Sequence, residues 1–258
     1  PATKAGLVPH KALYKIGLVS TKSGSQILDI DGQMYYQWQA GCDGWTSDNR
    51  FKILYEYADS EPMAVESDFS TFETFDGKSL NFTSQRKRDE EVFEEMRGQA
   101  LMAEAGGEAS FTIPEGLTFK LDKGNYFPMG HTLAVLAKAK AGEKFFTSTI
   151  FDGSDEQGPV EVNAFIGKDV KGAEGFTASK DLDVKLLDSP ARKVRLAFFP
   201  LSNPESAADY EMDVVLHENG VISDMQIHYE DFSLSQKLVA LEKQESGCTT
   251  QNKKAKAE

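Results

Sequence analysis

Trp38-Gln-Ala-Gly-Cys42-Asp-Gly-Trp45 contains both tryptophans and one of the two cysteines of this chain. The other cysteine, Cys248, lies 206 positions further on, near the end of the 258 residues. Two distant thiols and four scattered histidines are too few for a metal site, and no Cys-x-x-Cys motif indicates redox chemistry. We therefore predict one structural disulfide between the start and the end of the chain, the alternative being two unrelated thiols. Such a bond indicates an oxidising compartment such as the periplasm.

The composition is that of a water-soluble globular protein with an acidic surface. Hydrophobic residues make up 40% and charged residues 27% of the chain. The net charge of −13 argues against nucleic acid as a partner and against electrostatic binding to an anionic membrane. No apolar run approaches the roughly 20 residues that a membrane-spanning helix needs.

The two ends of the chain suggest processing and fraying. The sequence begins Pro1-Ala2-Thr3 without a methionine, which is compatible with removal of an export signal. The basic tail at the other end, residues 249–258, is expected to be frayed. No linker or repeat divides the chain, so we predict a single domain over residues 1–258, folded over about 10–248.

Apolar and polar residues alternate along most of the chain, which predicts β-strands with one face toward a core. Turn dipeptides such as Asp31-Gly32, Asp76-Gly77 and Asn219-Gly220 separate the alternating runs. We expect about fifteen antiparallel strands in an all-β fold. A sheet of that size must curl or split, and we predict one large sheet curled into an open β-spiral or barrel-like shape.

One segment, Pro128 to Gly142, is instead rich in Ala, Leu and Lys and predicts a short helix. Thr132 is its expected N-cap and Gly142 its expected C-terminal cap. Leu133 and Leu136 fall on one face, which we expect to lie in or against the lumen of the sheet. The segment Leu234–Lys243 fits either a last strand or a helix.

No catalytic motif is present, and neither a metal nor a cofactor is expected. His131 is either a ligand-binding or catalytic residue, or an ordinary surface or capping histidine. The 17 Phe and 8 Tyr either form a plain core or line an apolar cavity. A sheet this wide cannot be filled by its own side chains, so the helix, water or a ligand must occupy the middle. The predicted ligand-binding residues are Trp38, Phe127, His131, Leu133 and Leu136.

Several runs together resemble the EipB-like envelope-integrity family of α-proteobacteria. They are Tyr35 to Trp45 with Asn49-Arg50-Phe51, Phe127 to Leu133, Phe151-Asp152-Gly153 and the terminal Cys248. The resemblance implies a removed signal peptide, a periplasmic location, a β-spiral of about fourteen or more strands with a helix in its lumen, and a Cys42–Cys248 disulfide. It also implies a shape similar to lipoprotein carriers, a role in envelope integrity under stress, and a tetratricopeptide-repeat partner. No enzymatic activity is implied.

Three functions are compatible with these observations. The first is a non-enzymatic periplasmic factor that binds a lipid, a lipopeptide or a protein partner. The second is an adaptor that docks a partner without a ligand. The third is a hydrolase acting on an envelope polymer, which the acidic composition permits and no motif supports.

Overall fold

One curled antiparallel sheet accounts for most of the molecule. The computed structural model describes residues 6–201 and 207–248, so the predicted tail at 249–258 lies outside the described residues. The chain forms a single α-helix, a short 3-10 helix and fourteen strands within these ranges, which confirms the all-β prediction, with one strand fewer than expected. The strands are β1 (His10–Thr21), β2 (Ile27–Ala40), β3 (Gly44–Tyr57), β4 (Met63–Thr74), β5 (Ser79–Arg88), β6 (Glu91–Ala103), β7 (Gly106–Ile113), β8 (Thr118–Leu121), β9 (Phe145–Ile150), β10 (Val160–Val170), β11 (Ala191–Pro200), β12 (Tyr210–His217), β13 (Ile222–His228) and β14 (Phe232–Lys243). The helices are α1 (Pro128–Lys140) and η2 (Val184–Asp188).

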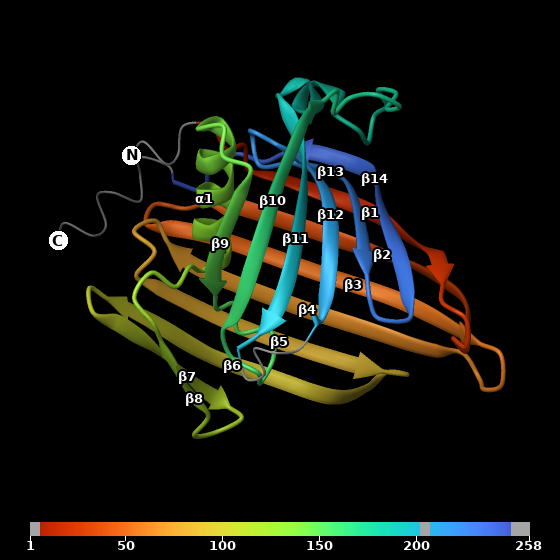
Figure 1. Cartoon of the computed structure of the whole chain (residues 1–258), viewed down its shortest axis with the longest axis horizontal. Coiled ribbons are helices and arrows are strands. Elements are labelled where there is room, and N and C mark those ends of the chain that lie inside the picture. Colours follow the sequence, from red (N-terminus) through yellow and green to blue (C-terminus); the bar gives the residue numbers. More distant parts are fainter. Residues whose placement is uncertain (1–5, 202–206, 249–258) are drawn as a thin grey trace.

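The order of the strands explains the shape. It runs β8-β7-β6-β5-β4-β3-β2-β1-β14-β13-β12-β11-β10-β9, so the first and last strands pair in the middle of the sheet. The two edges, β8 and β9, are not paired with each other in the described part of the chain, and the sheet stays open. Figure 1 shows the β9–β13 side lying in front of the β2–β6 side, with α1 beside β9. The predicted open β-spiral is confirmed.

The Asp31-Gly32 pair is not a turn, contrary to the sequence prediction. β2 runs straight through it, and Gly32 pairs with Ile53 on β3. A Cβ atom on Gly32 would lie 2.5 Å from the Lys52 carbonyl oxygen. This glycine therefore permits a close approach of two strands, which is the other common role of a strand glycine.

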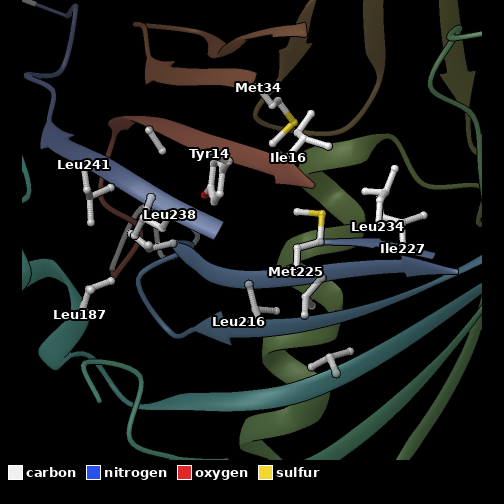
Figure 2. Close-up of a cluster of buried hydrophobic side chains, with 14 of the residues drawn as sticks. Tyr14, Ile16, Met34, Leu187, Leu216, Met225, Ile227, Leu234, Leu238 and Leu241 are labelled. Carbon is white, nitrogen blue, oxygen red and sulfur yellow. The ribbon is translucent and has the colours of Figure 1, made fainter. Parts of the chain in front are cut away.

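Three hydrophobic clusters line the concave side of the sheet. The largest, the lumen cluster, joins β1–β3 to β10–β14 and includes Tyr14, Ile16 and Met225 (Figure 2). A second cluster, here called the phenylalanine seam, contains Phe82, Phe111, Phe127 and Phe151 with their aliphatic neighbours. The third, the tryptophan corner, consists of Trp38, Ala40, Trp45 and Met129.

Helix α1 begins earlier than Thr132, the N-cap expected from the sequence. Its first residue is Pro128, where a missing N–H costs nothing. The following N–H groups, of Met129 and Gly130, donate to the Glu73 carboxylate of β4 at 2.7 and 2.8 Å. Gly142, with φ of +80°, follows the last turn as expected. The ambiguous segment Leu234–Lys243 lies within strand β14.

Candidate ligand-binding cavity

A cavity of about 500 Å³ lies inside the spiral, between the two sides of the sheet. Strands β1–β5 line one side, strands β11–β14 line the other, and α1 contributes a short face. The volume falls in the range of small-molecule sites, roughly 300–1,000 Å³. Protein interiors are normally close-packed, so a void of this size inside a hydrophobic cluster indicates space for a ligand.

The side formed by β11–β14 is almost entirely aliphatic. Alternation along each strand directs one set of side chains inward, and these sets are apolar because that face is shielded from water. The exceptions are Tyr210, Tyr229 and Gln236. The aliphatic lining residues from these strands are Val194, Leu196, Met212, Val214, Leu216, Ile222, Met225, Ile227 and Leu234.

The side formed by β3–β5 carries polar groups among its aromatic ones. Asn49, Ser67, Ser84 and Arg86 all line the cavity, and Ser67 and Ser84 are buried. These four residues were not among the predicted ligand-binding residues. Their inward position was visible in the alternation, because Asn49 shares its parity on β3 with Phe51 and Ile53.

Arg86 is held at the cavity by two contacts. Its Nη1 lies 2.7 Å from a Glu94 carboxylate oxygen, and its Nη2 donates to the Ser154 carbonyl at 3.1 Å. Asp152 also lines the cavity, and Asp155 lies close to it. Burial raises the pKa of the Asp155 carboxyl, and the Asp152 carboxylate adds to that effect.

Helix α1 presents Met129, His131, Thr132 and Val135 to the cavity. The His131 ring stacks on Phe146 of β9 with centroids 6.1 Å apart. Burial lowers the pKa of His131 to about 4, because the charged imidazolium would lose its hydration. The ring is therefore neutral at physiological pH, and its buried Nε2 has no hydrogen-bond partner among the described residues.

Two of the five predicted ligand-binding residues line the cavity, namely Trp38 and His131. Phe127 lies instead in the phenylalanine seam, and Leu133 packs at the tryptophan corner. Leu136 packs against the lumen cluster without being a lining residue. The helix face toward the cavity thus differs from the predicted leucine face, because the Glu73 contacts with Met129 and Gly130 fix the orientation of α1 at its first turn.

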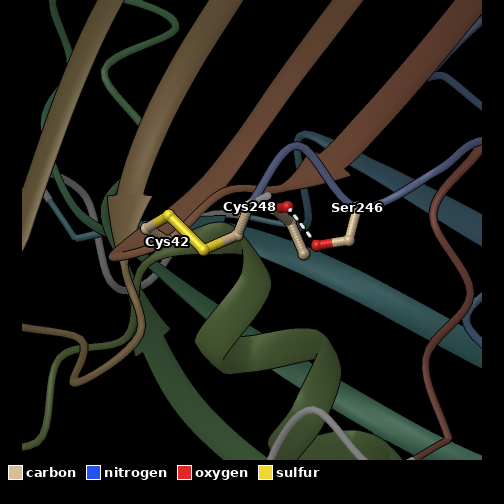
Figure 3. The surroundings of a disulfide bond; sticks show 4 residues. Cys42, Ser246 and Cys248 are labelled. Atoms are coloured by element: carbon tan, nitrogen blue, oxygen red, sulfur yellow. Dashed lines mark hydrogen bonds between the residues drawn. A yellow bond between two sulfur atoms is a disulfide. The ribbon is translucent and has the colours of Figure 1, made fainter. Parts of the chain in front are cut away.

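The predicted disulfide is present and joins two segments that are far apart in the sequence. Cys42 and Cys248 are bonded, with Cα atoms 4.8 Å apart (Figure 3). The segment after β14 is also fixed by hydrogen bonds, since the Ser246 hydroxyl and the Gly247 N–H both donate to the Ala40 carbonyl. The bond therefore ties the segment after β14 to the β2–β3 turn beside the tryptophan corner.

These features define a class of protein: an open antiparallel β-spiral that encloses a mainly apolar cavity, with a disulfide that joins the segment after the last strand to the turn between the second and third strands. A family model described as EipB-like matches residues 1–245, and the chain belongs to that family. Its sequence is 29% identical over 260 residues to the cell envelope integrity protein EipB of Brucella abortus (strain 2308), covering 96% of this chain and 90% of the relative.

A solved structure shows the same fold. The crystal structure of a β-barrel-like protein of a domain of unknown function from Brucella abortus superposes with a TM-score of 0.85 at 28% identity. The match covers 93% of this chain and 99% of that one. The name of the sequence relative supports a role in cell envelope integrity. Among the described residues, no helix is long and apolar enough to cross a membrane.

Proposed function

We propose that this protein maintains the cell envelope by binding an acyl chain of a lipid or lipopeptide inside its β-spiral. The observation that carries the proposal is the cavity of about 500 Å³ with an aliphatic wall. Burying each methylene of a chain there stabilises the complex by about 0.8 kcal/mol. A chain of many methylenes can therefore bind tightly without any charged contact.

The periplasm is the proposed location. A disulfide between Cys42 and Cys248 persists in an oxidising compartment, and the family relative is named for the envelope. A tetratricopeptide-repeat partner remains a prediction that rests on family membership. The activity is proposed to be binding and not catalysis, because the family relative is named for envelope integrity and the lining of the cavity is mainly apolar.

The proposal is tested by identifying what the protein retains. Protein exported to the periplasm is purified without detergent, extracted with organic solvent and analysed by mass spectrometry. We expect acylated molecules in stoichiometric amounts. Protein without any acylated ligand, and unable to take one up from an envelope extract, would contradict the proposal.

A pair of adjacent substitutions separates the cavity from the outer surface. Val214 lines the cavity, whereas its neighbour Val215 on the same strand faces outward. Val214→Phe is expected to exclude the acylated ligand, and Val215→Phe to leave it bound. If a partner protein binds Val214→Phe as well as the parent, the adaptor function gains support for that interaction.

A further inference from the structure

Four polar residues of the cavity lie on neighbouring strands and are here called the polar floor: Asn49 on β3, Ser67 on β4, and Ser84 and Arg86 on β5. His131 on α1 and Gln236 on β14 line the cavity outside this group. The strand register shows how the residues of the polar floor are arranged. Phe69 lies directly opposite both Asn49 and Ser84, and Ser67 lies directly opposite Arg86. Ser67 is therefore a diagonal neighbour of Asn49 and Ser84, at about 7–8 Å.

Other polar side chains nearby on the same sheet form hydrogen bonds with each other. Two residues along β3 and β4 from the Asn49–Phe69 pair, the hydroxyls of Ser47 and Thr71 hydrogen-bond to each other at 2.7 Å, and neither residue lines the cavity. In contrast, the buried Oδ1 of Asn49 has no partner among the described residues. An unpaired buried polar atom costs about 1–3 kcal/mol, and the Asn49 residue lines the cavity, so a polar ligand group beside this amide would remove that cost.

The charges near the polar floor disfavour an anion. Arg86 is already paired with Glu94 and with the Ser154 carbonyl, so its charge is compensated. Asp152 lines the cavity beside it, and Asp155 interacts with the charges of Asp152, Arg86 and Glu94. One guanidinium thus shares this region with three carboxylates, and a carboxylate or phosphate ligand would meet net negative charge.

The aliphatic wall of β11–β14 lies on the other side of the same cavity. A ligand that satisfies both sides must carry an acyl chain next to an uncharged group with hydrogen-bond donors and acceptors. We infer that the cavity selects neutral acyl ligands with a hydroxyl- and ester-bearing polar end, of the acylglycerol class. This inference rests on the proposed acyl-chain binding and specifies the chemistry of the ligand's polar end.

The test compares three ligands with the same C18 chain on delipidated protein at pH 7.5. They are 1-monooleoylglycerol, methyl oleate and oleate, each measured by displacement of an apolar fluorophore below its aggregation concentration. Monooleoylglycerol is expected to bind at least tenfold more tightly than either of the others. Methyl oleate lacks the hydroxyls that the polar floor would bind, and oleate carries the disfavoured charge.

Substitutions in the polar floor test whether these residues cause the preference for monooleoylglycerol. Asn49→Leu keeps the approximate shape without the amide, and the pair Ser67→Ala with Ser84→Ala removes two hydroxyls. Each is expected to reduce the monooleoylglycerol advantage to about threefold while methyl oleate binding stays unchanged. Thr83→Ala, on the exposed face of β5, is the matched control and should preserve the tenfold preference. Thermal unfolding of each variant verifies that the fold is retained.

Each outcome is decisive. Oleate or methyl oleate binding as tightly as monooleoylglycerol, or a preference that survives all the floor variants, would overturn the inference and leave the proposed function standing. If none of the three ligands binds, the proposed function fails and the inference fails with it.

Discussion

The phenylalanine seam and the cavity are built from the same sheet, yet one is filled and the other is hollow. In the seam, Phe82 packs edge-on against Phe111 and Phe151, with ring centroids 4.9 and 5.6 Å apart. The loop after β9 approaches this cluster closely, since a Cβ on Gly153 would lie 2.3 Å from the Phe82 ring. In the cavity, the aliphatic wall and the polar floor leave about 500 Å³ between them.

The difference shows how a curled sheet can keep an internal space. The seam brings the strand-end loop directly against the β5–β8 side, so aromatic contacts hold the spiral closed there. Further along the sheet, α1 stands inside the spiral, anchored to Glu73 and stacked through His131 on Phe146. We interpret the phenylalanine seam as the contact that holds the two sides of the sheet together. We interpret α1 as the spacer helix, which keeps the two sides apart around the cavity.

A matched pair of leucines provides the largest expected contrast. Leu80 is fully buried in the seam, and Leu234 is 2% exposed but borders the cavity. Leu80→Ala should cost about 4–5 kcal/mol of unfolding free energy, because a new void opens in a packed cluster. Leu234→Ala should cost about 2–3 kcal/mol, since its side chain already lacks neighbours on one side. Equal losses in urea unfolding would show that the cavity is collapsed in solution.

Loss of the disulfide is expected to have the second largest effect on the unfolding free energy. Cys42→Ser or Cys248→Ser should lower the unfolding free energy by about 4 kcal/mol under oxidising conditions, because the bond restricts a loop of 206 residues in the unfolded chain. Reductant should have the same effect on the parent protein and none on either variant. Identical melting temperatures of oxidised and reduced parent protein would contradict this role.

Alternation predicted the faces of the strands and the all-β class, but not which part of the concave face is hollow. Phe127 and Trp38 are both buried aromatic residues, yet only Trp38 reaches the cavity. The distance between the two sides of the sheet depends on curvature, which strand periodicity does not encode. The start of α1 was missed for a related reason, since its capping carboxylate, Glu73, lies 55 residues earlier on β4.

The stability of the folded protein should depend on pH through Glu73, the carboxylate that caps the spacer helix α1. Burial raises the pKa of its carboxyl from 4.5 to about 7, although the Met129 and Gly130 N–H groups oppose this shift. The folded state therefore binds a proton more tightly than the unfolded state, and its extra stability is complete below about pH 4.5. That stability is lost as the pH rises through about 7.

Glu73→Gln removes this titration. The unfolding free energy of the parent should fall by about 3 kcal/mol relative to the variant between pH 4.5 and 8, because each pKa unit corresponds to about 1.4 kcal/mol. Urea unfolding of both proteins across this range measures the difference. A difference that does not vary with pH would show that the Glu73 carboxyl keeps the same pKa in the folded and unfolded chain.

The smallest expected change in unfolding free energy comes from enlarging a side chain that faces the cavity. The same enlargement in the phenylalanine seam provides the direct comparison. Val214→Phe places a ring in the cavity, where space exists, and should change the unfolding free energy by less than about 1 kcal/mol. Ala109→Phe places the same ring in the seam, where Ala109 is fully buried, and should cost about 3 kcal/mol through overpacking. A large loss for Val214→Phe would mean that the two sides of the spiral meet in solution, because only a closed interior resists an added side chain.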